Sequence, residues 1–192
     1  MSDGCMRRST RLIVIRHGET YLNAKKVHQG QLQGSLNPKG RSQASELAKT
    51  LKPEKIDVIY SSDLRRAIQT SKIIAKYHKA PIIYDKDLRE RHMGVFQGRP
   101  RSETAEMRAS GKDFKPKGGE SDADQVRRTR RFLTRMRREK NLEGMTVLVS
   151  GHAGTAWCMT AILTKVPLHK VKKMGQRTRA FLYSGLTGSP PS

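Results

Sequence analysis

The stretch LIVIRHGET (residues 12–20) joins a short apolar run to a cluster of polar residues. Four consecutive apolar residues bounded by polar ones are typical of a strand that is buried on both faces. The run stops at Arg16 and His17, and Gly18 follows. A buried strand that ends on an arginine and a histidine has two interpretations: a functional site at its carboxyl end, or a loop whose first polar residues these are. The strand end taken alone favours the loop, and His17 becomes a candidate catalytic residue only together with the ends of other strands.

Short apolar runs alternate with segments of helical spacing along the rest of the chain. Further strands are expected at residues 57–60 (DVIY), 81–84 (PIIY), 145–149 (MTVLV) and 180–183. Helices are expected after the turn at 37–40, after Ser61-Ser62-Asp63 (whose side chains should cap the helix), near 102–108, at Arg127–Lys140 and at 153–163. This alternation predicts an α/β fold of three layers, α/β/α, with a mainly parallel central sheet.

The length of the chain limits the number of domains, and its net charge indicates the class of partner. The 192 residues suffice for one domain, which we expect at 12–183 between a basic N-terminal extension (1–11) and a flexible tail (184–192). The chain has 39 Lys and Arg against 17 Asp and Glu, a formal net charge of +22. Such a charge favours anionic partners, namely small phosphorylated metabolites, nucleic acid or acidic surfaces.

Cofactor and compartment signals are sparse. Cys5 and Cys158 cannot form a disulfide framework, and no CxxC spacing or cluster of Asp, Glu and His suggests a metal site. We therefore expect no metal and no cofactor. No apolar run reaches the roughly 18 residues that a membrane span needs. The absence of a disulfide framework favours a reducing compartment, the cytoplasm, and the basic N-terminus keeps a mitochondrial presequence open as the alternative.

Polar residues follow three of the expected strands. The first strand ends at Arg16 and His17, the second runs into Ser61-Ser62-Asp63 with Arg66 behind it, and the fourth runs into His152. Because the carboxyl ends of parallel strands meet at one edge of a sheet, we expect these residues to lie together.

Their chemistry suits phosphoryl transfer. A neutral histidine nitrogen can attack phosphorus and later leave as phosphohistidine. The transferring group spreads negative charge over three oxygens, which Arg16, Arg66 and a protonated His152 could neutralise. Glu90, in the polar loop after the third strand, is a candidate acid for the leaving oxygen, and Asn23 could donate its amide. None of these roles requires a metal.

Six motifs in this order resemble the histidine phosphatase superfamily, also called phosphoglycerate mutase-like. They are RHGET…N (16–23), QGQLQGSLNPKG (29–40), SSDLRRAIQT (61–70), LRERHMGVFQG (88–98), GGES (118–121) and VLVSGHAG (147–154). Within the superfamily, the fourth and fifth motifs are most similar to the TIGAR-like fructose-2,6-bisphosphatases. The chain departs from the family pattern at 151–153, where Gly-His-Ala replaces Ser-His-Gly, and at 176–178.

The resemblance implies a role for each matching residue. His17 would carry the phosphoryl group, clamped by Arg16, Arg66 and His152. Glu90 would be the acid that protonates the leaving oxygen and then the base that activates water. The substrate side would be formed by Asn23, Gln29 and Gly30, and Ala153 still offers its backbone N–H there. The resemblance assigns no role to Thr20, which we expect to be a backbone cap or a phosphate contact.

The function expected from these residues is that of a metal-independent phosphatase. Its substrate would be a sugar or glycerate bisphosphate such as fructose 2,6-bisphosphate, hydrolysed through phosphohistidine. A phosphoglycerate mutase is the first alternative, disfavoured because mutases of the superfamily carry extra segments that close over the site. The second alternative is a catalytically idle member that acts as a basic RNA-binding or assembly subunit.

The expected helix Arg127–Lys140 carries eight basic residues and one acidic residue. Three interpretations stay open: a solvated helix face, long-range attraction of a multiply charged substrate, or a docking surface for RNA or another polyanion. Phe132 is the one aromatic residue in this helix, which disfavours recognition of single strands by base stacking.

Overall fold

The apolar run at 12–15 forms the buried part of β1 (Arg11–Arg16), and each of its four side chains is at most 1% exposed. The computed structural model describes residues 9–173 and 180–184. The expected N-terminal extension and C-terminal tail lie almost wholly outside these ranges, and their boundaries stay predictions.

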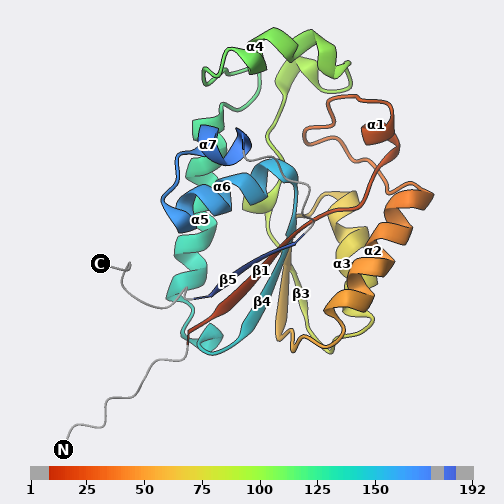
Figure 1. Cartoon of the computed structure of the whole chain (residues 1–192), viewed down its shortest axis with the longest axis vertical. Helices are drawn as coiled ribbons and strands as arrows, with labels where there is room; N and C mark the ends of the chain where they lie inside the picture. Colours follow the sequence, from red (N-terminus) through yellow and green to blue (C-terminus); the bar gives the residue numbers. More distant parts are fainter. Residues whose placement is uncertain (1–8, 174–179, 185–192) are drawn as a thin grey trace, which may run out of the picture.

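β1 lies inside a five-stranded sheet whose strand order is β3-β2-β4-β1-β5. The other strands are β2 (Val58–Ser61), β3 (Ile82–Tyr84), β4 (Thr146–Gly151) and β5 (Ala180–Ser184). β1 to β4 are parallel, and β5 pairs with β1 in the antiparallel direction. The expected mainly parallel sheet is confirmed, with every predicted strand within two residues of its expected bounds (Figure 1).

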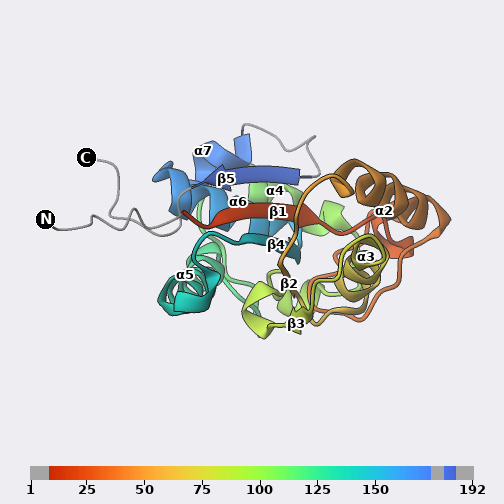
Figure 2. The same cartoon turned by 90° about the horizontal axis from the view of Figure 1, so that it is seen from below.

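Helices cover both faces of the sheet, as Figure 2 shows. Ile13 and Ile15 point to the face covered by α2 (Pro38–Leu51) and α3 (Arg65–Ala75), whereas Leu12 and Val14 point to the face covered by α5 (Asp122–Arg138) and α6 (Ala153–Thr164). This alternation follows from the two-residue period of a strand. Burial on both faces explains why the strands read as continuous apolar runs rather than as alternating ones.

Shorter elements lie around this framework. α1 (Tyr21–Ala24) and α4 (Ala105–Ala109) lie beyond the carboxyl ends of the strands, near the top of Figure 1. α4 continues a 3-10 turn (Arg101–Thr104), and together they are the short helix expected near 102–108. α7 (Leu168–Lys173) packs on α6 and was not expected, because its six residues are too few for an apolar period.

The expected cap of α3 is wrong. The N-cap residue is Leu64, which has no side-chain cap. The Asp63 side chain binds Arg89 instead of capping the helix: Nε of Arg89 donates to it over 2.7 Å. Ser62 accepts a 3.3 Å bond from the Leu64 N–H but also contacts His152 at 2.9 Å, so this serine links the helix to the site.

Four of the seven arginines of the basic helix form ion pairs within the described part of the chain. It begins at Asp122 and ends at Arg138, so Lys140 belongs to the following 3-10 turn. The paired side chains are Arg127 with Asp124, Arg128 with Glu120, Arg131 with Asp87, and Arg135 with Asp85 and Asp87. Arg130, Arg137 and Arg138 are exposed, and they form no ion pair with any residue that the structure describes. Docking of a polyanion on this face stays a prediction.

Within the described ranges, no helix combines the length and the apolar character needed to cross a membrane.

Candidate active site

The ends of β1, β2 and β4 bring the predicted site residues to one edge of the sheet. The backbone N–H of His17 donates to the Gly151 carbonyl over 3.0 Å, and that of Ser62 donates to the Ser150 carbonyl over 2.9 Å. These bonds extend the parallel ladders by one residue each. His17 and His152 therefore leave neighbouring strands side by side, and their ring centroids are 5.1 Å apart.

His17 is held as a neutral imidazole with one nitrogen ready to react. The residue is 8% exposed, and Nδ1 lies 2.7 Å from the Gly18 carbonyl oxygen. Because a carbonyl can only accept, the proton is on Nδ1 and the lone pair is on Nε2. Nε2 accepts a 3.1 Å bond from Nε of Arg66. Burial, and then the charge of Arg66, lower the pKa of His17 well below its usual value.

Arg66 links this imidazole to the loop that follows α1. It is 1% exposed, and its two terminal nitrogens donate to the carbonyls of Leu32 (2.9 Å) and Gly30 (2.8 Å). Burial lowers the pKa of Arg66 to about 10, against the opposing effect of Glu90. The guanidinium therefore stays charged at neutral pH, next to the nitrogen of His17 that would bind phosphorus.

His152 is fully buried and occupies the N-cap position of α6. Its Nε2 lies 2.9 Å from the Ser62 hydroxyl, while Nδ1 is buried with no hydrogen-bond partner among the described residues. Burial, followed by the charge of Arg66, lowers the pKa of His152 well below its usual value. The structure therefore favours a neutral His152, not the cation considered from the sequence, with Nδ1 the nitrogen left for a ligand.

Glu90 lies in the loop after β3, against the amino end of α6. Its carboxylate accepts bonds from the Gly154 N–H (3.3 Å), the Gln125 side chain (3.2 Å) and the Arg91 N–H (2.9 Å). Its charge acts on the pKa of Arg66, so the carboxylate and the guanidinium share one electrostatic environment. The structure thus brings Glu90 to the same edge of the sheet as the two histidines.

Two further arginines face this site. The side chain of Arg16 makes no hydrogen bond or ion pair with a described residue. Burial, and then the charges of Arg16 and Arg108, lower the pKa of Arg101, and Arg101 in turn contributes to lowering the pKa of His17. Two cations that repel each other near a buried nucleophile would be stabilised by an anion between them.

The residues predicted for the substrate side are mostly engaged with one another. Thr20 and Asn23 form a capping box at α1, and the Thr20 hydroxyl donates to Gln29 over 2.9 Å. Gly30 adopts φ +49°, and its carbonyl accepts from Arg66. Ala153 is the first residue of α6, so its N–H has no partner within the helix. Thr20 and Gln29 thus stabilise the loop, and their contact with substrate stays a prediction, as does that of the other three.

Sequence reasoning missed several residues that shape the site: Arg101, Gln125, Arg128 and Gly154. Arg101 lies three residues after the end of the motif that contains Glu90 (88–98), in the irregular region 89–120, and this position was the signal that could have identified it. Gln125 and Arg128 lie on the buried side of a helix whose charge suggested a solvated face. The departure noted at 176–178 lies outside the described residues.

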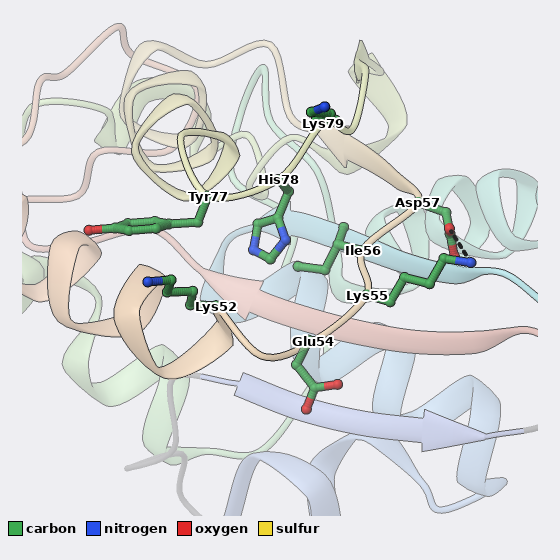
Figure 3. Close-up of a pocket in the computed structure, with 8 residues that line it drawn as sticks. All are labelled: Lys52, Glu54, Lys55, Ile56, Asp57, Tyr77, His78 and Lys79. Carbon is green, nitrogen blue, oxygen red and sulfur yellow. Dashed lines mark ion pairs between the residues drawn. The ribbon is translucent and has the colours of Figure 1, made fainter.

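A surface cavity of about 360 Å³ lies at the other end of the sheet. Figure 3 shows it between the end of α2, the end of α3 and the segment before β2, with His78 pointing toward Ile56. Its lining residues are Lys52, Glu54, Lys55, Ile56, Asp57, Tyr77, His78 and Lys79. None of the predicted site residues is among them. Among the described residues, no group of three or more His, Cys, Asp or Glu is placed to hold a metal ion.

Fold and site define a three-layer α/β protein with two buried, neutral histidines and converging arginines at the carboxyl edge of its sheet. Residues 12–184 match the family model described as histidine phosphatase superfamily (branch 1), and the chain belongs to that superfamily. The resemblance carried by the six motifs is confirmed.

Individual relatives agree with this assignment. Glucosyl-3-phosphoglycerate phosphatase of Mycolicibacterium vanbaalenii is 32% identical over 180 residues, 88% of this chain and 80% of that protein. Fructose-2,6-bisphosphatase TIGAR of Bos taurus is 42% identical over 126 residues, 61% of this chain and 46% of that protein. A solved mycobacterial glucosyl-3-phosphoglycerate phosphatase superposes with a TM-score of 0.80 at 29% identity, covering 92% of this chain and 90% of that one. Three of the curated relatives are matched over only 40 to 46% of their own length.

Proposed function

We propose that the chain is a metal-independent phosphatase that works through a phosphohistidine at His17. The observation that carries this proposal is the state of His17: a buried, neutral imidazole whose Nε2 lone pair is oriented by Nε of Arg66. A nucleophile needs this lone pair, and the guanidinium beside it supplies charge where the phosphoryl oxygens would lie.

The reaction has two steps. In the first, Nε2 of His17 forms a bond to phosphorus, the bond from phosphorus to the ester oxygen breaks, and Glu90 gives its proton to the leaving oxygen. In the second, water attacks the phosphohistidine, Glu90 takes a proton from that water, and the N–P bond breaks to release inorganic phosphate. Arg66 and an N–H of His152 stabilise the charge on the phosphoryl oxygens in both steps.

The substrate we propose is a small phosphate ester with a second anionic group. Arg16 and Arg101 support this class, because they add positive charge at the site beyond what Arg66 provides for the reacting phosphate. Relatives named for glucosyl-3-phosphoglycerate, fructose 2,6-bisphosphate and phosphoserine act, by those names, on esters that carry a second phosphate or a carboxylate. A sugar or glycerate bisphosphate, such as fructose 2,6-bisphosphate, belongs to the same class.

The chemical roles are tested with a panel of phosphate esters. His17→Ala should reduce turnover to less than about one thousandth of that of the wild type, with no acid-labile phosphoprotein. Glu90→Gln should slow alkyl phosphates about a hundredfold or more, and 4-nitrophenyl phosphate far less, because nitrophenolate leaves without a proton. His169→Ala and Glu103→Gln, which alter exposed side chains, are the matched controls.

Three outcomes would contradict these roles. Full activity of His17→Ala would exclude the phosphohistidine, and equal losses on both ester classes would remove Glu90 from the acid role. With 3-phosphoglycerate and a trace of bisphosphoglycerate, isomerisation faster than phosphate release would identify a mutase instead.

The substrate class is tested at Arg101. Arg101→Gln should raise KM about tenfold or more for a bisphosphate or a phosphorylated carboxylate, because one charged hydrogen bond is lost. The KM for 4-nitrophenyl phosphate, which has no second anionic group, should change little. Arg99→Gln, two residues earlier and exposed, is the control. An equal change in KM for both kinds of substrate would reject a second anionic subsite at Arg101.

A further inference from the structure

Arg128 is the most completely bonded side chain near the site. It lies on α5, is 8% exposed, and donates five hydrogen bonds. Its Nε and Nη2 bind the two carboxylate oxygens of Glu120 at 2.8 and 2.9 Å. The remaining bonds go to backbone carbonyls: from Nη1 to Asp87 (2.9 Å) and Arg89 (2.6 Å), and from Nη2 to Glu90 (3.0 Å). A guanidinium has five N–H donors, so none is left over.

These bonds hold the backbone both before and after Glu90 in the chain. Arg128 binds the carbonyls of the residues that lead up to Glu90, and the carbonyl of Glu90 itself. Glu120, held by the same arginine, accepts a 2.8 Å bond from the N–H of His92, two residues after Glu90. The backbone on either side of the carboxylate is therefore fixed to one ion pair, Arg128–Glu120.

We propose that Arg128 is a positioning residue for the reaction: through its pair with Glu120, it sets where the Glu90 carboxyl lies relative to the leaving oxygen. Arg128 does not touch the reacting atoms, and its effect passes through the backbone of the 87–92 loop. The proposal rests on the acid role of Glu90 in the proposed function. The proposal also explains the GGES motif, because Glu120, the partner of Arg128, belongs to that motif.

Only arginine can fill this role, for geometric reasons. Lysine has one nitrogen with three donors, so it cannot bind a carboxylate in a bidentate manner and three separate carbonyls at once. After Arg128→Lys, at least two of these buried acceptors lose their partner, and the loop must move to reach water or another donor. A shift of about 1 Å in a proton donor is enough to cost a large factor in rate.

The experiment compares Arg128→Lys with Arg131→Lys at a known concentration of active sites. Arg131 is a matched control, since it lies one turn along the same helix and pairs with the Asp87 side chain, but not with the carbonyls of Arg89 and Glu90. We expect Arg128→Lys to lower kcat/KM for an alkyl phosphate about tenfold or more while 4-nitrophenyl phosphate changes less than about threefold. Arg131→Lys should leave the ratio of the two substrates unchanged.

Glu120→Gln provides a second route, because it keeps the size of the side chain and removes the charge of the pair. It should shift the same ratio in the same direction, and it carries the test if Arg128→Lys does not fold. Equal losses on both esters in these variants, while Glu90→Gln remains selective for alkyl phosphates, would overturn the positioning role alone. If Glu90→Gln is itself unselective, the acid role of the proposed function fails first.

Discussion

At the scale of single residues, the position of the Glu90 carboxylate depends on the glycine at 154. A Cβ built at Gly154 would lie 2.3 Å from Oε1 of Glu90 and 2.8 Å from the Gln125 side chain. The carboxylate thus occupies the space in which any other residue would place its first side-chain carbon. The same contact lets the Gly154 N–H, at the amino end of α6, donate to Glu90.

Gly154→Ala should therefore reduce activity without unfolding the protein. Alanine is favoured over glycine in a helix by about 1 kcal/mol, and Glu90 can swing aside, so the melting temperature should change little. Turnover of alkyl phosphates should fall about tenfold or more, because the acid is displaced. Gly151→Ala is the control, since its Cβ would meet only ordinary contacts at 3.5 Å and beyond. Wild-type turnover by Gly154→Ala would show that Glu90 does not need this position.

At the scale of elements, the loop after β1 is held by its close approach to α2. A Cβ at Gly40, in the first turn of α2, would lie 2.0 Å from the Glu19 carbonyl, and one at Gly18 would lie 2.2 Å from the Gly40 carbonyl. Both obstacles are backbone atoms, which cannot rotate away. This contact places the loop that carries His17, so packing between strand and helix sets the position of the nucleophile.

Gly40→Ala should destabilise the fold by about 1–3 kcal/mol, the usual cost of overpacking. The sign of this change in the free energy of unfolding is informative, because replacing glycine by alanine at an unobstructed helix position would raise the stability. Urea unfolding measures the free energy, and Ser42→Ala on the exposed side of the same helix should change it by less than about 0.5 kcal/mol. A Gly40→Ala variant as stable as the wild type would mean that the loop does not press on α2.

At the scale of the whole molecule, burial and the excess of positive charge both disfavour the protonated form of the buried histidines. Besides the pair at the site, His28 is 8% exposed, and its Nε2 lies 2.6 Å from the Thr104 hydroxyl. Burial, and then the charges of Arg108 and Arg101, lower the pKa of His28 to about 4. Protonation of any of these three rings would therefore oppose folding.

The free energy of unfolding should fall as the pH is lowered from about 7 to about 5. An unfolded histidine binds a proton near pH 6.5, whereas folded His28 does so only near pH 4. Between these values the unfolded state holds more protons, so acid favours it, by about 2 kcal/mol at pH 5 for His28 alone. Denaturant unfolding at the two pH values measures the change.

His28→Gln isolates this contribution, because other groups still titrate in the variant. Its stability should depend less steeply on pH than that of the wild type, whereas Ser42→Ala, at an exposed position with no titratable side chain, should keep the wild-type slope. Equal slopes in all three proteins would show that His28 titrates normally in the fold.

The fold could be predicted from the sequence because its signals are local. A buried strand needs consecutive apolar residues, as at 12–15, and a helix on the sheet needs one apolar stripe, as in α5. Element boundaries were less accurate where competing partners decide them, as at Asp63, which binds Arg89 instead of capping α3. The residues at the strand ends could be assigned to one site because the carboxyl ends of parallel strands lie at one edge of the sheet.

By itself, the sequence determined the order of the strands and of the helices that cover the sheet, the family and the main set of candidate residues, since each depends on residue type and spacing along the chain. The tertiary structure alone decided the protonation state of the two histidines and which further residues contact the site. The neutral form of His17 and His152 follows from burial. Three of the five bonds of Arg128 join segments about 40 residues apart in the chain. Desolvation and contact between distant segments leave no pattern along a single chain, so only the folded arrangement reveals them.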